Sequence, residues 1–292
     1  MTIGRVFHYT PVVEDLSEAE AFFHTYFAPH CFYRGYSPHW HRAAAILVVS
    51  EFVIEPLQPL APVDDKPASS WYRFLQRHGP RVLNLSFYAT DLGELAARLA
   101  ENGIGSTDAG NPATLFMHPK DFPGTIEFFD PGVQSGMADP RRAPSWNAAY
   151  WRDFHPLGLR HPSHVTVVVR DHRAAAKRYV DALGSEVLPD QPARIAGARS
   201  TFVTVGPEVV IELAEPQDGD CPLAADLDRV GESICGVTFR VGDVAAARAS
   251  IERNGGEVVP TLDGTVAFPR AVTFGSDYAF TDRPLDGDPR VW

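Results

Sequence analysis

A recurring pattern of apolar and polar positions divides the chain into four similar segments. In each segment a short apolar strand leads into a turn that contains aspartate, and the turn leads into an amphipathic helix. Glycine closes Ala-rich helical stretches such as LAARLAENG and AAARASIERNGG. The segments begin at Phe7, Leu83, Ser163 and Cys235, and their turn aspartates are Asp15, Asp91, Asp171 and Asp243. A carboxylate in this place can accept hydrogen bonds from the first unpaired N–H groups of a helix, so each aspartate is predicted to be an N-cap.

Runs rich in β-branched and aromatic residues follow each predicted helix and favour further strands. They cover residues 43–59, 114–131, 200–216 and 271–284. Each segment is therefore a strand, a helix and two or three more strands, which we call a module. Because one such module cannot cover both faces of its sheet, the modules are expected to pair.

Changes in composition place the boundaries between modules. Residues 56–70 are Pro-rich, residues 130–162 carry an aromatic stretch, and residues 214–232 are acidic and irregular. The predicted division is an N-terminal domain over 1–131 (modules 1–55 and 80–131), a linker over 132–159, and a C-terminal domain over 160–292 (modules 160–216 and 233–292).

Charge and cysteine content narrow the class of protein. The 292 residues carry a net charge of −11, which argues against binding to a nucleic-acid backbone. The three cysteines, Cys31, Cys221 and Cys235, show no metal-binding or disulfide spacing. The first residues lack the apolar core of a secretory signal, and the longest strongly apolar run, 43–49, is far shorter than the ~20 residues that cross a bilayer. We therefore expect a soluble, cytoplasmic protein with a small-molecule partner, no nucleic-acid partner and no membrane contact.

The modular pattern resembles the vicinal oxygen chelate superfamily, which includes glyoxalase I, methylmalonyl-CoA epimerase, extradiol dioxygenases and bleomycin-resistance proteins. The resemblance covers nearly the whole chain, and the stretch from Trp71 with FMHPKDFPGTIEFF is most similar to the epimerase branch. It implies an α+β fold: four βαβββ modules paired into two glyoxalase-like domains, each a curved mixed β-sheet cup with flanking helices. One scaffold of this kind hosts unrelated reactions, so the fold alone does not define the activity.

The resemblance also implies where a metal would bind in the N-terminal cup. Its positions correspond to His8, Glu55, Asn84 and Glu127 in this chain. An imidazole, two carboxylates and an amide oxygen suit a divalent Mn, Fe, Co, Ni, Zn or Mg ion. Asn84 departs from the pattern, which has histidine there, and an amide oxygen is the poorer ligand for a transition metal.

The C-terminal cup keeps only part of that set. His164 and Glu212 occupy the ligand positions of the third module, whereas Gly236 and the region of Ala279 offer no ligand in the fourth. This half is expected to hold a vestigial site. For any one of these residues the alternative remains a core histidine or a solvated glutamate.

Further residues are candidates for contact with the substrate. His39 and His41 would share one face of a strand and, with Tyr36 and Trp40, would form a rim beside an aromatic cup. Lys120 would meet an anionic substrate, or else belong to a surface hairpin. Rim histidines could also serve as ligands.

Three functions remain open from the sequence. The first is a metal-dependent isomerase, epimerase or lyase that acts on a small carbonyl, thioester or aromatic compound, with Glu127 as the first candidate base and Glu55 as the second. The second is a ring-cleaving, extradiol-type dioxygenase. The third is a metal-free binding or resistance protein that sequesters a small hydrophobic molecule. With any of these functions the protein is expected to be a monomer or a homodimer.

Overall fold

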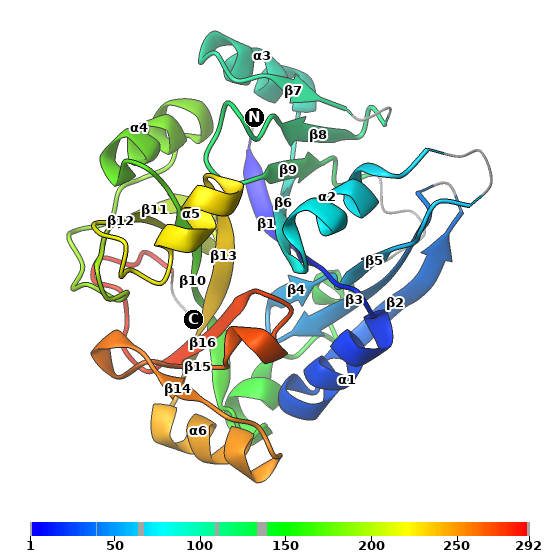
Figure 1. Ribbon diagram of the computed structural model, residues 1–292. Coiled ribbons are helices and arrows are strands. Elements are labelled where there is room, and N and C mark those ends of the chain that lie inside the picture. The colour runs from blue at the N-terminus through cyan, green and yellow to red at the C-terminus, as the bar shows by residue number, and fades with distance from the viewer. Residues whose placement is uncertain (1, 39, 64–66, 109–110, 133–138, 291–292) are drawn as a thin grey trace.

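The protein has a mixed α+β fold built on two curved, mixed β-sheets (Figure 1). The computed structural model describes residues 2–38, 40–63, 67–108, 111–132 and 139–290. The strands of the first sheet lie between residues 3 and 129, and those of the second lie between residues 159 and 281. Within the described ranges, no helix has the length and apolar character needed to cross a bilayer.

The first sheet contains the first two modules. Module one consists of β1 (Ile3–Val12), α1 (Leu16–Phe27), β2 (His30–Ser37), β3 (Arg42–Val49), β4 (Phe52–Ile54) and β5 (Leu57–Pro59). Module two consists of β6 (Arg81–Ala89), α3 (Leu92–Glu101), β7 (Ser106–Thr107), β8 (Thr114–Met117) and β9 (Ile126–Phe129). The strand order is β2-β3-β4-β1-β6-β9-β8-β7, so the modules join where β1 and β6 pair antiparallel.

The second sheet repeats this arrangement. Module three consists of β10 (Leu159–Val168), α4 (His172–Leu183), β11 (Ala198–Val205) and β12 (Val209–Pro216). Module four consists of β13 (Ser233–Val241), α6 (Val244–Arg253), β14 (Val259–Pro260), β15 (Val266–Ala267) and β16 (Asp277–Thr281), with short 3-10 turns at Leu262–Gly264 and Arg270–Val272. The order is β11-β12-β10-β13-β16-β15-β14, and β10 pairs antiparallel with β13.

The predicted helix N-caps are confirmed in all four modules. The side chains of Asp15, Asp91, Asp171 and Asp243 each accept a hydrogen bond from at least one N–H group of the first helical turn. These bonds satisfy backbone donors that have no partner inside the helix. The caps therefore fix where each helix starts after its module's first strand.

The segments between modules contain more regular structure than the sequence suggested. Strand β5 lies inside the Pro-rich segment, and helix α2 (Ser70–His78) starts at its end. Helix α5 (Ala224–Val230) lies in the segment that joins modules three and four. The aromatic stretch between the two sheets holds a 3-10 turn (Pro140–Arg142) and a π-helical turn (Tyr150–Phe154).

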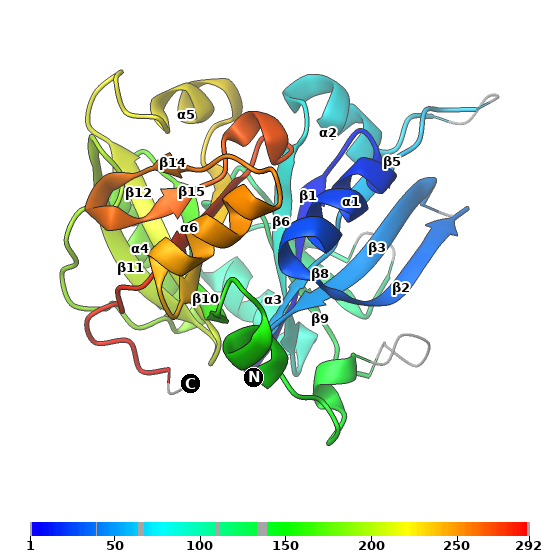
Figure 2. The same ribbon diagram turned by 90° about the horizontal axis from the view of Figure 1, so that it is seen from below.

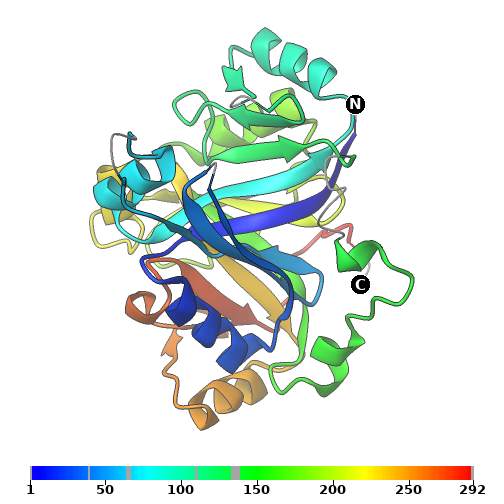
Figure 3. The ribbon, with the colours of Figure 1, turned by 90° about the vertical axis from the view of Figure 1, so that its right-hand side faces the viewer.

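Helices from opposite halves lie next to each other at two places. Helix α1 lies beside α6 (Figures 2 and 3), where a Cβ on Gly256 would approach Tyr26 to 2.9 Å. Helix α3 lies near the end of α4, and the Arg98 Nη2 group donates to the carbonyl of Asp181 at 3.1 Å. One continuous hydrophobic core therefore includes residues of both halves.

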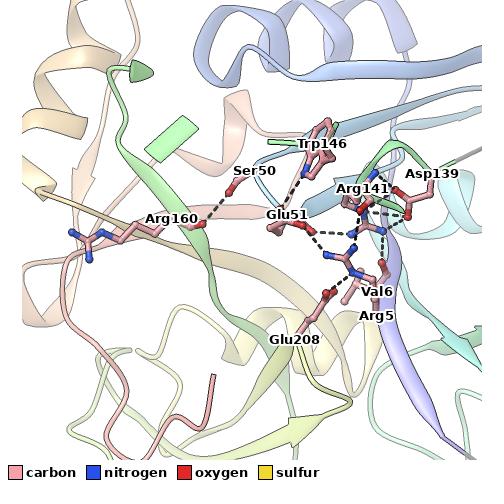
Figure 4. A network of polar contacts seen from close by, with 9 residues as sticks. All are labelled: Arg5, Val6, Ser50, Glu51, Asp139, Arg141, Trp146, Arg160 and Glu208. Atoms are coloured by element: carbon pink, nitrogen blue, oxygen red, sulfur yellow. Dashed lines mark hydrogen bonds and ion pairs between the residues drawn. The ribbon is translucent and has the colours of Figure 1, made fainter. Parts of the chain in front are cut away.

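A polar network also connects the halves near the start of β1 (Figure 4). The Arg5 guanidinium binds Glu51 of its own half at 2.7 Å and Glu208 of the other half at 2.5 Å. From the connecting segment, Arg141 donates to the carbonyl of Glu51 at 2.8 Å, and Trp146 donates to its carboxylate at 3.0 Å. The connecting segment is thus tied to the first half, and Arg5 joins that half to the second.

Candidate functional sites in the two cups

Four adjacent strands of the first sheet bring together the residues singled out in the N-terminal half. His8 lies on β1, Glu55 directly follows β4, Asn84 lies on β6 and Glu127 lies on β9, in the strand order β4-β1-β6-β9. All four side chains are buried and line one cavity of about 50 Å³. Its described lining also includes Thr10, Arg42, Leu57, Trp71, Phe116 and Phe129.

Hydrogen bonds divide this site into two groups. Around Glu55, His8 Nδ1 lies 3.3 Å from the carboxylate, and Arg42 Nη1 donates to it at 3.0 Å. Around Glu127, Asn84 Nδ2 donates at 2.5 Å and Ser86 Oγ donates at 2.7 Å. One carboxylate therefore has a cationic partner, and the other is held by an amide and a hydroxyl.

The environment of Glu127 favours its protonated form. Burial is the largest cause, the nearby Glu55 adds to it, and together they raise the pKa of Glu127 to about 8 against the opposing bond from Ser86. Burial likewise lowers the pKa of His8 to about 4, which keeps the imidazole neutral near pH 7. A carboxyl group that titrates near neutrality in a cavity is suited to acid–base chemistry.

The donor set found here does not form a metal centre. Across the part of the chain that the structure describes, no group of three or more His, Cys, Asp or Glu side chains is placed to hold a metal ion. Glu55 is engaged by Arg42 and Glu127 by Asn84, whose Oδ1 is left without a hydrogen-bond partner in the buried site. The divalent metal stays a prediction of the resemblance, and no step proposed below depends on it.

The C-terminal cup places His164 and Glu212 together as well. His164 Nε2 lies 3.4 Å from Glu212, which also accepts hydrogen bonds at 2.8 Å from Thr166 and from Ser200. Burial, the largest influence, would raise the pKa of Glu212, but the interactions with His164, Thr166 and Ser200 outweigh it and lower the pKa. Unlike Glu127, this carboxyl group is ionised at neutral pH.

The C-terminal cup encloses far more space than the N-terminal one. Its cavity has a volume of about 420 Å³, within the range of small-molecule pockets. In the fourth module the ligand positions of the second module, Asn84 and Glu127, are replaced by Gly236 and the region of Ala279. Because Thr238 faces Ala279 in the β13–β16 register where Ser86 faces Glu127 in β6–β9, the position equivalent to Glu127 has no carboxyl group.

The sequence reasoning missed the hydroxyl groups and the arginines of these sites. A hydroxyl residue lies two places after each first-strand position, as Thr10, Ser86, Thr166 and Thr238. The first three bond the glutamate of the neighbouring strand, so the repeated spacing was a usable signal. Arg42 and Arg194, by contrast, line the cavities from positions that no repeat marks.

Other predicted contact residues lie away from the N-terminal cavity. Its described lining does not include Tyr36, which is 50% exposed, or Trp40, whose ring packs edge-on against Trp71 at 5.3 Å. His41 lies near Tyr36, and Lys120 is exposed in the hairpin between β8 and β9. His39 falls outside the described residues. Their contact with a substrate stays a prediction.

Paired modules of a strand, a helix and further strands, with a cavity in each half, define the fold class, and comparisons with known proteins identify the family. Residues 163–274 match the family model described as the glyoxalase/bleomycin resistance protein/dioxygenase superfamily. The chain is also similar to the ethylmalonyl-CoA/methylmalonyl-CoA epimerase of Cereibacter sphaeroides, with 33% identity over 98 residues, which cover 33% of this chain and 72% of that protein. The protein belongs to the glyoxalase/bleomycin resistance/dioxygenase superfamily, also called the vicinal oxygen chelate superfamily.

A solved structure shares the architecture of all four modules. A triple mutant of 4-hydroxymandelate synthase from Streptomyces coelicolor matches with a TM-score of 0.69 over 96% of this chain and 92% of its own. At 15% sequence identity the likeness shows the fold alone. It confirms the predicted fold class.

Proposed function

We propose that this protein is an isomerase, epimerase or lyase that moves a proton next to a carbonyl or thioester group, with Glu127 as the acid–base residue. The observation that carries the proposal is the position of Glu127, buried in a cavity that it shares with the second carboxyl group, Glu55, where burial raises the pKa of Glu127 to about 8. Two carboxyl groups with different partners in one cavity can take different roles in proton transfer. The similarity to an epimerase supports this class of reaction.

The residues of the cavity suggest how the proton would move. Deprotonated Glu127 takes a proton from the carbon next to the carbonyl, and the electron pair passes to the carbonyl oxygen as an enolate. The Arg42 guanidinium, which lines the same cavity and donates to Glu55 through Nη1 alone, is the group available to stabilise that negative oxygen. Delivery of a proton to the opposite face by the second carboxyl group, Glu55, gives an epimer, and return of the proton from Glu127 to a neighbouring position gives an isomer.

The size of the cavity limits what enters it. About 50 Å³ admits the reacting carbonyl and its adjacent carbon, whereas whole small ligands occupy ~300 Å³ or more. The remainder of a substrate would lie across Trp71 and Phe116 at the edge of the cavity. The name of the similar epimerase makes CoA thioesters the first substrate class to test.

The test is exchange of the acidic C–H proton in D₂O, followed by NMR with methylmalonyl-CoA and ethylmalonyl-CoA. We expect the wild type to catalyse exchange and Glu127→Gln to slow it by roughly 10²- to 10⁴-fold, because glutamine cannot take the proton. Glu101→Gln, at an exposed position, is the matched control and should exchange like the wild type. Absence of exchange in the wild type, or equal rates in the wild type and Glu127→Gln, contradicts the proposal.

The alternative functions draw less support from the geometry. The resemblance implies that a ring-cleaving dioxygenase would have a two-His, one-carboxylate iron site in its second half. At the matching positions this chain has His164 and Glu212, but position 236 is glycine. Sequestration of a hydrophobic molecule is favoured by one observation, the 420 Å³ cavity of the C-terminal cup. That cavity is the subject of the inference below.

A further inference from the structure

The C-terminal cavity has an apolar wall interrupted by a few polar groups. Leu223, Phe268 and Ala279 are among its apolar lining residues. His164, Thr238 and Arg194 are among the polar ones. An apolar cavity of 420 Å³ with a small number of convergent polar groups is the arrangement expected of a small-ligand site.

Arg194 is the unusual member of this wall. It lies in the loop before β11 and is only 7% exposed. Its Nη2 group donates to the carbonyl of Pro284 at 3.1 Å, whereas Nε and Nη1 are buried without a hydrogen-bond partner among the described residues. Buried N–H groups of a cation are costly to leave unpaired, so this guanidinium calls for an acceptor.

The acidic groups of the cup are already engaged by other partners. Glu212 accepts from Thr166 and Ser200, and no carboxylate of the described chain lies within ion-pair distance of Arg194. The neighbouring Arg270 differs from Arg194, because two of its nitrogens bind Asp277 at 2.6 Å each and a third binds Asp226. Arg194 is thus the arginine of this wall whose donors remain available to a ligand.

We propose that the C-terminal cup binds a small organic acid, with its carboxylate on Arg194 and its apolar body against Leu223 and Phe268. A carboxylate oxygen is a strong acceptor for guanidinium N–H groups and supplies the missing negative charge. The ionised Glu212 in the same cavity disfavours a doubly charged anion such as phosphate. This site is separate from the proton-transfer cavity and does not depend on the chemistry of Glu127.

A fluorinated pair of probes tests the charge requirement. We expect the full-length protein to bind 4-fluorobenzoate roughly 10- to 100-fold more tightly than its neutral isostere, 4-fluorobenzamide, in ¹⁹F NMR titrations, since the acid alone makes a charge-assisted bond. Inorganic phosphate should compete more weakly than 4-fluorobenzoate. Equal affinity for acid and amide, tighter binding of phosphate, or no binding of the acid overturns the proposal.

Matched variants assign the effect to Arg194. Arg194→Gln should remove the preference for the acid, whereas Arg199→Gln, which makes the same charge change at an exposed position of β11, should keep it. The ligand-free Arg194→Gln protein should unfold at the same temperature as the wild type or higher, because the desolvation cost of a buried guanidinium with two nitrogens unpaired in the described chain is removed. A preference that survives Arg194→Gln, or is lost equally in Arg199→Gln, contradicts the assignment.

A second variant keeps the test decisive if Arg194→Gln does not fold. Ala279 lies on β16 and lines the cavity, so Ala279→Leu places a larger side chain in the space of the ligand. We expect binding of the acid and the amide to weaken together. Unchanged affinity for 4-fluorobenzoate in Ala279→Leu would place the acid outside this cup and overturn the proposal. Exchange catalysis by Glu127 is measured independently of either result.

Discussion

Glu127 and Glu212 show how neighbours control a buried carboxyl group. Both are almost fully buried, which alone favours the protonated form. Glu212 has His164 beside it in addition to two hydroxyl donors, and its pKa is lowered. Glu127 has Ser86 and Asn84 as donors but also the carboxyl group of Glu55 nearby, and its pKa is raised to about 8. The two cups therefore present different charge states from similar residues.

The raised pKa of Glu127 predicts how stability depends on pH. The folded state holds this proton up to about pH 8, whereas the unfolded chain releases it near the ordinary value of 4.5. The contribution to folding is therefore complete below about pH 4.5 and is lost as pH rises to about 8. His8 has the opposite effect on the free energy of unfolding, which it increases as pH rises. This effect is confined to the range between about pH 4, its lowered pKa, and pH 6.5, its ordinary value. Above pH 7 the effect of Glu127 is free of that of His8.

Urea unfolding between pH 7 and 8.5 checks this dependence. We expect the wild type to lose about 1 kcal/mol of unfolding free energy between pH 7 and 8 relative to Glu127→Gln, since one bound proton changes stability by at most ~1.4 kcal/mol per pH unit. Glu101→Gln should follow the wild type. Parallel pH dependences in the wild type and Glu127→Gln would show that Glu127 titrates at its ordinary pKa.

From the sequence, only residues at positions repeated in each module could be predicted to lie together. His8 and Asn84 lie at matched places on the first strands of their modules, and the structure has both lining one cavity. Arg42 comes from β3, whose register against β4 and β5 depends on the folded sheet, so no spacing marked its bond to Glu55. That bond engages one of the expected metal ligands, and the role of each residue in the site stays a prediction.

At the scale of elements, local capping chemistry explains which helices the sequence revealed. The four module helices begin after aspartates whose side chains cap them, and they were predicted. Helix α5 has no side-chain cap at its start and spans only seven residues. The sequence therefore contains no helix signal there, and its segment is interpreted as a linker. Helix α2 does have a cap, Ser69, but its nine residues follow a Pro-rich run. Short helices of this kind are stabilised mainly by tertiary contacts.

The close pairing of β13 with β16 requires glycine at position 236 of β13. A Cβ on Gly236 would clash with the backbone and side chain of Asp277, its partner in the parallel register. We expect Gly236→Ala to lower the free energy of unfolding by about 1–3 kcal/mol because strand backbone cannot move aside cheaply. In Gly219→Ala the new methyl group meets nothing within 4 Å, so this variant should be near neutral. Equal midpoints for both variants in urea unfolding would contradict the requirement.

At the scale of the whole molecule, aromatic side chains of α1 connect the halves. Phe22, Phe23 and Phe27 belong to the first module by sequence. Each of them also packs against Tyr278 of β16, with ring centroids 5.6–6.2 Å apart. Periodicity shows that a helix face is apolar but not which sheet covers it. The contact between the halves could not be predicted for this reason.

These contacts predict that the two halves unfold together. Phe27 is fully buried, and its ring also packs against Phe239 at 5.7 Å and Phe280 at 5.9 Å in the second sheet. We expect Phe27→Ala to cost about 3–5 kcal/mol, the usual range for truncating a buried phenylalanine, and to shift the unfolding of both halves equally. Phe154→Ala, at a side chain that is 78% exposed, is the matched control and should unfold like the wild type.

Two spectroscopically independent probes separate the halves in this experiment. In a Trp292→Phe, Cys31→Ser background, tryptophan fluorescence reports the first half and the connecting segment, for example through Trp71 and Trp151, whereas thiol labelling of the buried Cys221 and Cys235 reports the second half. Coincident urea midpoints by both probes, shifted together in Phe27→Ala, are expected because one hydrophobic core includes both sheets. If Phe27→Ala moved the fluorescence transition and left Cys235 protected, the halves would be independent folding units and the shared core would contribute little to their coupling.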